Sequence, residues 1–191
     1  KRVVRLINDP TTAAMAYALQ QRDGGGRFLV FDLGGGTFDV SILEMFEGVM
    51  EVHASAGDNF LGGEDFLSAL RDACLRDLKI DPRSLTASEE AHLRRRLEMT
   101  KRELSASSGT PVDVELSLSG TTHRWQVDET TFARLCDPLV QRLRTPLERA
   151  MRDARLAPEQ LDDIVLVGGA SRMPLAARLV SRMFGRLPLR H

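Results

Sequence analysis

Three consecutive glycines between two aspartates are the residues of this chain whose types and spacing best suit chemistry. The segment reads FDLGGGTFD over residues 31–39 and follows an apolar run. Backbone amides without neighbouring Cβ atoms can approach a phosphate closely, a hydroxyl adds a donor, and two carboxylates can bridge hydrated Mg²⁺ to phosphate oxygens. The pattern therefore favours a magnesium-polyphosphate site over a plain glycine-rich hairpin. The candidate residues are Asp32, Gly34, Gly35, Gly36, Thr37 and Asp39.

This segment is not a Walker A loop, because it contains no Gly-Lys-Ser/Thr triplet and no helix follows it. A second glycine pair lies further on, where residues 165–174 read VLVGGASRMP between an apolar strand and a helix. Gly168 and Gly169 would let a flat ligand lie against the backbone, and the Arg172 guanidinium could stack on a purine face. By itself, however, the segment is typical of an ordinary strand-to-helix turn.

A polar stripe is predicted on a helix in the middle of the chain. Glu98, Lys101, Arg102 and Ser105 follow the spacing i, i+3, i+4, i+7, which places them on one helical face. Leucines occupy a separate face, so the stripe is expected to point outward. On spacing alone, a solvated surface with ion pairs is the favoured interpretation.

One further carboxylate, Asp9, stands between a predicted strand at 1–7 and a predicted helix at 11–20. A side chain in that position commonly caps the helix, and this interpretation is favoured without further context. The glycines of LGGEDF at 61–66 also precede a helix, and no chemistry is assigned to them.

Strands are predicted on both sides of the three glycines and could hold them in place. Apolar and β-branched runs predict strands at 27–33, 37–46 and 49–56, and links this short require an antiparallel meander. A further buried strand is predicted at 164–167, and Pro174 marks the first turn of a helix that follows it. The two glycine motifs therefore both follow predicted strands.

The middle of the chain shows helical periodicity. One helix is predicted after Gly63, and the pair Asp81-Pro82 ends it. Thr86 and Glu89 have the spacing of a capping box and open a helix that runs to about Leu104. This second helix carries the polar stripe.

A hairpin and a long helical stretch complete the middle of the chain. Strands predicted at 112–116 and 121–125 can pair across a Ser-Gly turn. The stretch 129–155 is helical in pattern, and Pro138 and Pro146 are expected to break or kink it. The strands and helices together predict an α/β chain with a helical insertion that has its own small sheet.

The composition is that of an ordinary globular protein, with 42% hydrophobic and 28% charged residues and a formal net charge of -1. That balance gives no electrostatic reason to expect nucleic acid or an anionic membrane as a partner. The basic run RRR at 94–96 is interpreted as a solvated helix face. Cys74 and Cys136 are too few for a disulfide framework, so buried, reduced thiols of a cytoplasmic protein are expected.

Taken in order, five segments resemble the seventy-kilodalton heat-shock chaperone family, the DnaK-like chaperones. The resemblance covers essentially the whole chain. Sugar kinases and actins share the general plan but not this ordered series. The matching segments are residues 8–11, 31–40, 56–58 with 61–66, 98–105 and 165–174.

The resemblance implies one lobe of an actin-like ATPase, built on a ribonuclease-H-like sheet with an inserted α+β outer subdomain. By this likeness, residues 23–61 and 137–191 form the inner subdomain of the second lobe, and residues 62–136 form its outer subdomain. Residues 1–22 would be a crossing strand and helix. The first lobe and a peptide-binding domain are expected to lie elsewhere in a longer protein.

The resemblance also implies ATP or ADP with Mg²⁺ as ligands. Asp32 would position the metal and the attacking water, with Thr37 beside it and with Asp39 and Asp9 near the metal, the last through water. The loop of Gly34, Gly35, Gly36 and Thr37 would hold phosphate. The outer wall of the adenosine pocket would be Glu98, Lys101, Arg102 and Ser105, and the inner wall Gly168, Gly169, Arg172 and Met173.

Two positions depart from the family pattern. Asp9 stands where the family carries Glu, which shortens the reach of this carboxylate by one methylene. Ala170 stands where Ser or Gln is common, which removes one polar contact to the nucleoside.

The implied function is ATP hydrolysis that drives peptide binding and release, with a J-domain co-chaperone and a nucleotide-exchange factor as partners. Donors must surround the transferred phosphate from both sides, and this chain supplies one side, so we expect little or no turnover from it alone. Two alternatives remain open. One is a non-catalytic docking module for an exchange factor, and the other is another ATPase of the actin and sugar-kinase superfamily.

Overall fold

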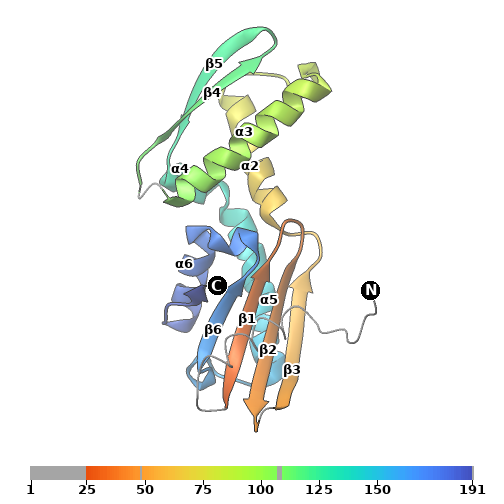
Figure 1. The fold of residues 1–191 in the computed structure, drawn as a ribbon, viewed down its shortest axis with the longest axis vertical. Coiled ribbons are helices and arrows are strands. Elements are labelled where there is room, and N and C mark those ends of the chain that lie inside the picture. Colours follow the sequence, from red (N-terminus) through yellow and green to blue (C-terminus); the bar gives the residue numbers. More distant parts are fainter. Residues whose placement is uncertain (1–24, 48, 107–108, 191) are drawn as a thin grey trace, which may run out of the picture. The chain divides into compact units, whose positions relative to one another are not determined.

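The computed structural model describes most of the chain, and the described residues form a mixed α/β fold (Figure 1). They are residues 25–47, 49–106 and 109–190. The strand and helix expected at the start of the chain, with Asp9 between them, lie outside the described residues. The chain divides into two compact units with one sheet each: Lys1–Gly62 with Val140–His191 (unit 1) and Gly63–Leu139 (unit 2).

The sheet of unit 1 has the strand order β3-β2-β1-β6-β7. Strands β1 (Gly26–Leu33), β2 (Phe38–Phe46) and β3 (Val49–Asp58) form the antiparallel meander that the short links predicted. Strand β6 (Asp163–Val167) pairs parallel to β1, and the two-residue β7 (Leu189–Arg190) pairs parallel to β6. Figure 1 shows β1 between β2 and β6, so the ends of β1 and β6 meet at one edge.

The core of unit 1 lies along the central strands. Phe31 and Phe38 are fully buried, and their ring centroids lie 4.6 Å apart at the end of the β1–β2 hairpin. Aromatic pairs at this separation stabilise a fold beyond the area they bury. The strand ends that carry the predicted site are therefore anchored by the core directly beneath them.

Helices α5 (Asp137–Ala154) and α6 (Pro174–Phe184) each bury one apolar face. Pro174 stands in the first turn of α6, as predicted. The long helical stretch breaks after α4 (Glu129–Leu135), close to Pro138, but Pro146 lies inside α5 and does not break it.

Pro146 is buried together with Leu143 and Leu147, on the side of α5 that packs in the core. A proline inside a helix removes one backbone hydrogen bond. Here the burial of its ring offsets that loss, so α5 continues through Pro146 and the break, one of the two predicted outcomes, does not occur.

Unit 2 contains the predicted insertion. Helices α2 (Gly63–Asp77) and α3 (Ala87–Ala106) pack together, and α3 also packs on the hairpin of β4 (Val112–Leu118) and β5 (Thr121–Val127). A short 3-10 turn, η1 (Pro82–Ser84), links the two helices. The two strands pair across Ser119 and Gly120 as the sequence predicted.

The capping box at the start of α3 is confirmed. The Glu89 carboxylate accepts from the Thr86 backbone N–H at 2.8 Å, and the Glu89 N–H donates to the Thr86 hydroxyl at 3.2 Å. Cys74 and Cys136 are buried and free, and burial raises the pKa of each thiol to about 12. Both thiols therefore stay protonated near neutral pH.

Two of the three arginines at 94–96 of α3 make contacts within unit 2, so the run is not the fully solvated helix face that the sequence predicted. Arg94 pairs with Glu64, and Arg96 donates to the Asp113 backbone carbonyl at 3.0 Å. Only Arg95 of the three is plainly exposed and without such a contact among the described interactions. None of the described helices is long and apolar enough to cross a membrane.

Replacing Glu90 by glutamine is expected to lower the free energy of unfolding by about 1 kcal/mol at neutral pH. Arg71 holds the Glu90 carboxylate with two hydrogen bonds of 2.7 and 2.8 Å. The hydrogen bond from Arg71 lowers the pKa of Glu90. The stabilisation is therefore present above the unfolded-state pKa and disappears as pH falls through the folded-state pKa.

Urea unfolding followed by Trp125 fluorescence measures this effect, because Trp125 is the single tryptophan and is buried in unit 2. The difference between wild type and Glu90→Gln is expected to shrink on the acid side. Glu115→Gln is the matched control, since Glu115 pairs with Arg124 at 3.6 Å on the exposed surface of the same unit. An equal loss in both variants would contradict the assignment.

Candidate functional site

The glycine loop is a four-residue connection at the end of the β1–β2 hairpin. Leu33 and Phe38 pair as the last strand residues, and the Gly34 N–H donates to the Thr37 carbonyl at 3.0 Å. Gly34 is half-buried, and the rest of the loop is exposed. The loop therefore lies open at the surface of unit 1.

The glycines at 35 and 36 are not required by the loop itself. Neither has a φ in the left-handed region, so the backbone bend there is one that other residues adopt. A Cβ built at Gly35 or Gly36 meets nothing within 4 Å among the described residues. Glycine is therefore not required for the turn at these two positions, and no described residue fills the space above them.

Asp32 and Asp39 face each other across the hairpin. They are directly paired in the antiparallel register of β1 and β2, so their side chains project from the same face. Both residues are half-buried. Like charges directly opposite each other destabilise a sheet.

Two further glycines make room for these carboxylates. A Cβ at Gly57 would lie 2.7 Å from Asp39 Oδ1, and a Cβ at Gly168 would lie 2.7 Å from Asp32 Oδ1. Gly57 is the β3 partner of Asp39, and Gly168 directly follows Val167, the β6 partner of Asp32. Each carboxylate thus occupies space that a side chain on the adjoining strand would fill.

These two carboxylates do not make a complete metal cage. Within residues 25–47, 49–106 and 109–190, no group of three or more His, Cys, Asp or Glu side chains could hold a metal ion. Mg²⁺ typically keeps several waters and binds one or two carboxylates plus substrate phosphates. The donor set of Asp32 and Asp39 fits an ion of that kind, delivered with a phosphate ligand.

The second glycine motif lies beside the first. Gly168 has φ 86° and ψ 151°, a conformation that is essentially restricted to glycine, and its Cβ would lie 2.3 Å from the Leu33 carbonyl oxygen. The Ser171 hydroxyl donates to the Gly168 carbonyl at 2.7 Å and fixes this turn. Arg172 is exposed, whereas Met173 is buried, so the Met173 side chain belongs to the core.

The segment that follows β3 packs closely against the glycine loop. A Cβ at Gly62 would lie 2.4 Å from the Gly35 carbonyl carbon and oxygen and from the Gly36 nitrogen. Asp58 fixes the chain before this point, because it accepts from the Phe60 N–H at 3.0 Å and from Arg142 at 2.7 Å. The Phe60 hydrogen bond, with a further contribution from Arg142, lowers the pKa of Asp58.

The polar stripe lies on α3 in unit 2, but Lys101 does not point outward. Lys101 is only 7% exposed, and its ammonium donates to the Gly63 carbonyl at 3.0 Å and pairs with Glu98 at 2.7 Å. Arg102 is exposed and pairs with Glu98 at 3.1 Å, and Ser105 donates to the Lys101 carbonyl. The prediction that all four side chains of the stripe point outward was therefore wrong for Lys101.

Two cations, Lys101 and Arg102, also stabilise the charged form of Glu98. Burial opposes its charged form, but the hydrogen bonds and charges of Lys101 and Arg102 outweigh burial and lower its pKa. Glu98 is thus a carboxylate held between two cations on one helical face. The stripe can accept as well as donate hydrogen bonds.

The structure brings the predicted residues together within each unit. In unit 1, the Asp32–Asp39 hairpin end and the Gly168–Arg172 turn adjoin through the β1–β6 pairing. In unit 2, the α3 stripe forms one connected set. Gly62 and Ser171 were given no role from the sequence. A serine three residues after a glycine is a recognisable turn signal, whereas Gly62 was noted only as one of two glycines before a helix.

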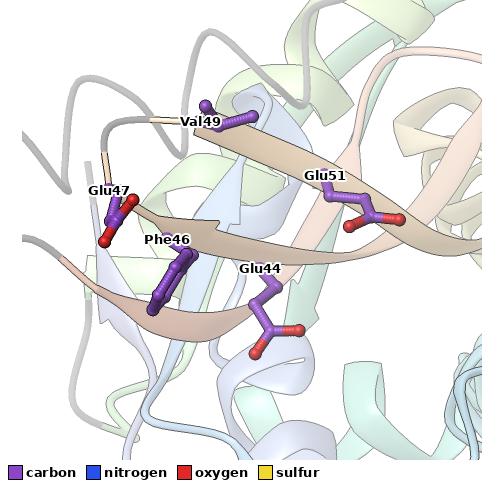
Figure 2. Close-up of a pocket in the computed structure, with 5 residues that line it drawn as sticks. All are labelled: Glu44, Phe46, Glu47, Val49 and Glu51. Atoms are coloured by element: carbon purple, nitrogen blue, oxygen red, sulfur yellow. The ribbon is translucent and has the colours of Figure 1, made fainter.

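The pocket in Figure 2 lies at the other end of the sheet of unit 1. It is lined by Glu44, Phe46, Glu47, Val49 and Glu51, from β2, β3 and the link between them, and has a volume of about 420 Å³. Glu44 pairs with Arg27 at 3.0 Å and with His53 at 2.7 Å. None of the predicted site residues lines this pocket.

Comparison with known proteins agrees with the sequence resemblance. The family model described as Hsp70 protein matches residues 2–191. Proteins named chaperone protein HscA homolog from Burkholderia cenocepacia and Burkholderia multivorans are 45% and 44% identical over 187 residues. A protein of the same name from Ralstonia nicotianae is 42% identical over 187 residues. Each alignment covers 98% of this chain and 30% of the relative, so the chain spans 30% of the length of these curated relatives. With the family model matched over nearly every residue, the chain belongs to the Hsp70 family of chaperones.

Proposed function

We propose that the chain is part of the ATP-binding domain of an Hsp70-family chaperone. In this proposal, unit 1 is the inner subdomain and unit 2 the outer subdomain of the second lobe of an actin-like ATPase. The ribonuclease-H-like sheet of that lobe would be β3-β2-β1-β6-β7. Family membership and the sheet order of unit 1 support this assignment.

One observation carries the proposal: among the described residues, nothing requires glycine at positions 35 and 36. Neither a left-handed φ nor a neighbouring atom of the described residues excludes a side chain there. A ligand that must approach the backbone amides would require glycine at both positions. A phosphate group is such a ligand, and the facing Asp32 and Asp39 supply the complementary place for its metal ion.

Each residue has a distinct task in this proposal. The N–H groups of the 34–37 loop and the Thr37 hydroxyl bind phosphate oxygens. Asp32 and Asp39 hold the water shell of Mg²⁺, which when bound would neutralise charge on the phosphates. Gly168, Gly169 and Arg172 accept the nucleoside in unit 1, as Glu98, Lys101, Arg102 and Ser105 do in unit 2.

Hydrolysis and its coupling to peptide binding belong to the whole protein. They would involve the J-domain co-chaperone and the nucleotide-exchange factor that the family resemblance implies. Catalysis of phosphoryl transfer depends on positioning and on charge stabilisation around the phosphate. The 191-residue chain is proposed to bind nucleotide and to show no hydrolysis above background.

Titration of the ¹⁵N-labelled chain with ADP and Mg²⁺ is expected to shift the amide resonances of the glycine loop first. The amides of Gly35 and Gly36 are expected to move in a saturable way, because their N–H groups bind the phosphates. Adenosine is expected to move Gly169 but not the loop. Removing Mg²⁺ with a chelator is expected to weaken ADP binding about tenfold or more.

The exposed turn at Gly120 in unit 2 serves as an internal reference, since no ligand contact is proposed there. If ADP moves neither the loop nor Gly169 at millimolar concentration, nucleotide binding by this chain is refuted. Robust multiple turnover of ATP by the chain would refute the one-sided phosphate site.

A further inference from the structure

An ion pair in unit 1 holds the segment at 57–62, which leads out of β3. The Arg142 guanidinium on α5 donates to Asp58 Oδ2 from Nη2 at 2.7 Å and from Nε at 3.2 Å. Nη2 also donates to the Phe60 carbonyl at 3.0 Å. These contacts span 84 and 82 positions in sequence, and all three residues belong to unit 1. One side chain therefore ties the segment to a helix that is distant in sequence.

Both peptide groups next to Phe60 are held by this arrangement. The peptide before Phe60 donates its N–H to Asp58 Oδ1 at 3.0 Å, and the peptide after it accepts from Arg142. The Phe60 ring is 84% exposed and does not anchor the segment, whereas the next residue, Leu61, is fully buried. The polar contacts and the Leu61 side chain therefore determine the path of the backbone into Gly62.

The two ends of the segment pack against groups of the proposed nucleotide site, also within unit 1. At its start, a Cβ on Gly57 would lie 2.7 Å from Asp39 Oδ1. At its end, a Cβ on Gly62 would lie 2.4 Å from backbone atoms of both Gly35 and Gly36. Atoms packed this closely cannot move toward each other, and a move apart would leave the loop backbone and the carboxylate without their support.

We propose that the Arg142–Asp58 ion pair positions the glycine loop and the Asp39 carboxylate for the phosphates and metal ion of the nucleotide. The inference rests on the proposed nucleotide site and adds two positioning residues to it. Neither side chain touches the ligand. The pair fixes the segment, and the close packing at its two ends fixes the loop and the carboxylate. Several N–H groups must converge on one phosphate, so a small displacement of the loop weakens its binding.

The geometry of this pair differs from that of an ordinary surface ion pair on the same helix. Exposed pairs contribute little to stability, and Arg144 with Glu148 at 2.6 Å is such a pair, because it joins two residues of α5 that lie four positions apart. The Arg142 guanidinium instead bonds a carboxylate and a backbone carbonyl of another segment. Removing Arg144 therefore removes a comparable ion pair without breaking the contacts to the segment.

The test compares how much the phosphates of ADP add to binding. Affinities of Mg-ADP and of adenosine are measured by NMR titration for the wild-type chain, Arg142→Met and Asp58→Asn. Each variant removes the ion pair, while Asp58→Asn keeps an oxygen that can accept from the Phe60 N–H. The ADP-to-adenosine affinity ratio is expected to fall about fivefold in both, as for the loss of partly exposed hydrogen bonds between charged groups.

A double variant tests whether the two residues act as one unit. Arg142→Met combined with Asp58→Asn is expected to lower the ratio no further than either change alone. Arg142→Lys keeps a cation for Asp58 and is expected to restore most of the ratio. Arg144→Met is the matched control and is expected to leave the ratio unchanged.

The ligand-free chain gives a second, independent measurement. The amide resonances of Gly35 and Gly36 are expected to shift in Arg142→Met and to stay in place in Arg144→Met. Such a shift reports the loop itself, because both glycines lie on the far side of the Gly62 contact from the ion pair.

The outcomes separate this inference from the proposed function. A ratio that is unchanged in Arg142→Met, or that falls equally in Arg144→Met, overturns the positioning role and leaves nucleotide binding intact. Equal weakening of ADP and adenosine also overturns it, since that result indicates a general loss of structure. If wild type binds neither ligand, the proposed function fails, and the ligand-free resonances decide alone. A shift confined to Arg142→Met then supports the hold on the loop, and its absence refutes it.

Discussion

Alanine at position 168 is expected to destabilise unit 1 by about 3 kcal/mol or more. Gly168 has φ 86° and ψ 151°, where a residue with a Cβ is strained by about 1–3 kcal/mol. The added Cβ would also lie 2.3 Å from the Leu33 carbonyl oxygen and 2.7 Å from Asp32 Oδ1. Since Leu33 is fully buried at the end of β1, its backbone cannot move away cheaply, and overpacking adds about 1–3 kcal/mol.

Native-state hydrogen exchange measures this effect where it arises. The protected amides of β1 and β6 are expected to exchange about a hundredfold faster in Gly168→Ala. Gly169→Ala is the control for stability, because a Cβ there meets nothing within 4 Å and no left-handed φ is involved. That variant is expected to stay within about 0.5 kcal/mol of wild type. Equal exchange rates in the two variants would rule out the close approach of Gly168 to the Leu33 carbonyl.

Much of the fold could be predicted from the sequence because its signals are local. Apolar runs and short links determine the meander, and the Thr86–Glu89 spacing determines the start of α3. Strand β7 could not be predicted, since its two residues are a strand only by pairing with β6. Pro146 could not be placed either, because the burial that keeps it in the helix is a tertiary property.

The candidate site likewise has features that the sequence predicts and features that it does not. The loop and its two aspartates were visible as a motif, and a hairpin of known register places those aspartates opposite each other. The roles of Gly57 and Gly62 were not visible, because each depends on an approach between segments that the sequence does not relate locally. Lys101 was assigned to an outward stripe for the same reason: helical spacing gives a face but not what lies against it.

Glycine has three separate uses around the candidate site. At Gly168, glycine satisfies both a special backbone conformation and a close approach. At Gly57 and Gly62, it satisfies close approaches alone. At Gly35 and Gly36, neither condition holds among the described residues, and the proposed phosphate ligand would account for glycine there. The first two uses predict loss of stability on substitution, and the last predicts loss of binding.

Asparagine at position 32 is expected to remove the Mg²⁺ dependence of ADP binding while leaving the fold in place. Asp32 stands opposite Asp39 on the same face of the sheet, beside the loop that is proposed to bind phosphate. Asparagine keeps the shape of the side chain but loses its charge, so attraction for a divalent cation at short range is lost. Affinity for ADP in Mg²⁺ is expected to fall about tenfold or more, towards the value measured with a chelator.

Stability is expected to respond differently, because removing one of two facing like charges relieves repulsion. The free energy of unfolding of Asp32→Asn is therefore expected to stay within about 1 kcal/mol of wild type. Asp162→Asn is the matched control at the opposite end of β1, where Asp162 accepts from the Arg27 N–H at 2.7 Å. Asp162→Asn is expected to keep the full Mg²⁺ effect. If Asp32→Asn also kept it, the metal would lie elsewhere, and the facing carboxylates would need another explanation.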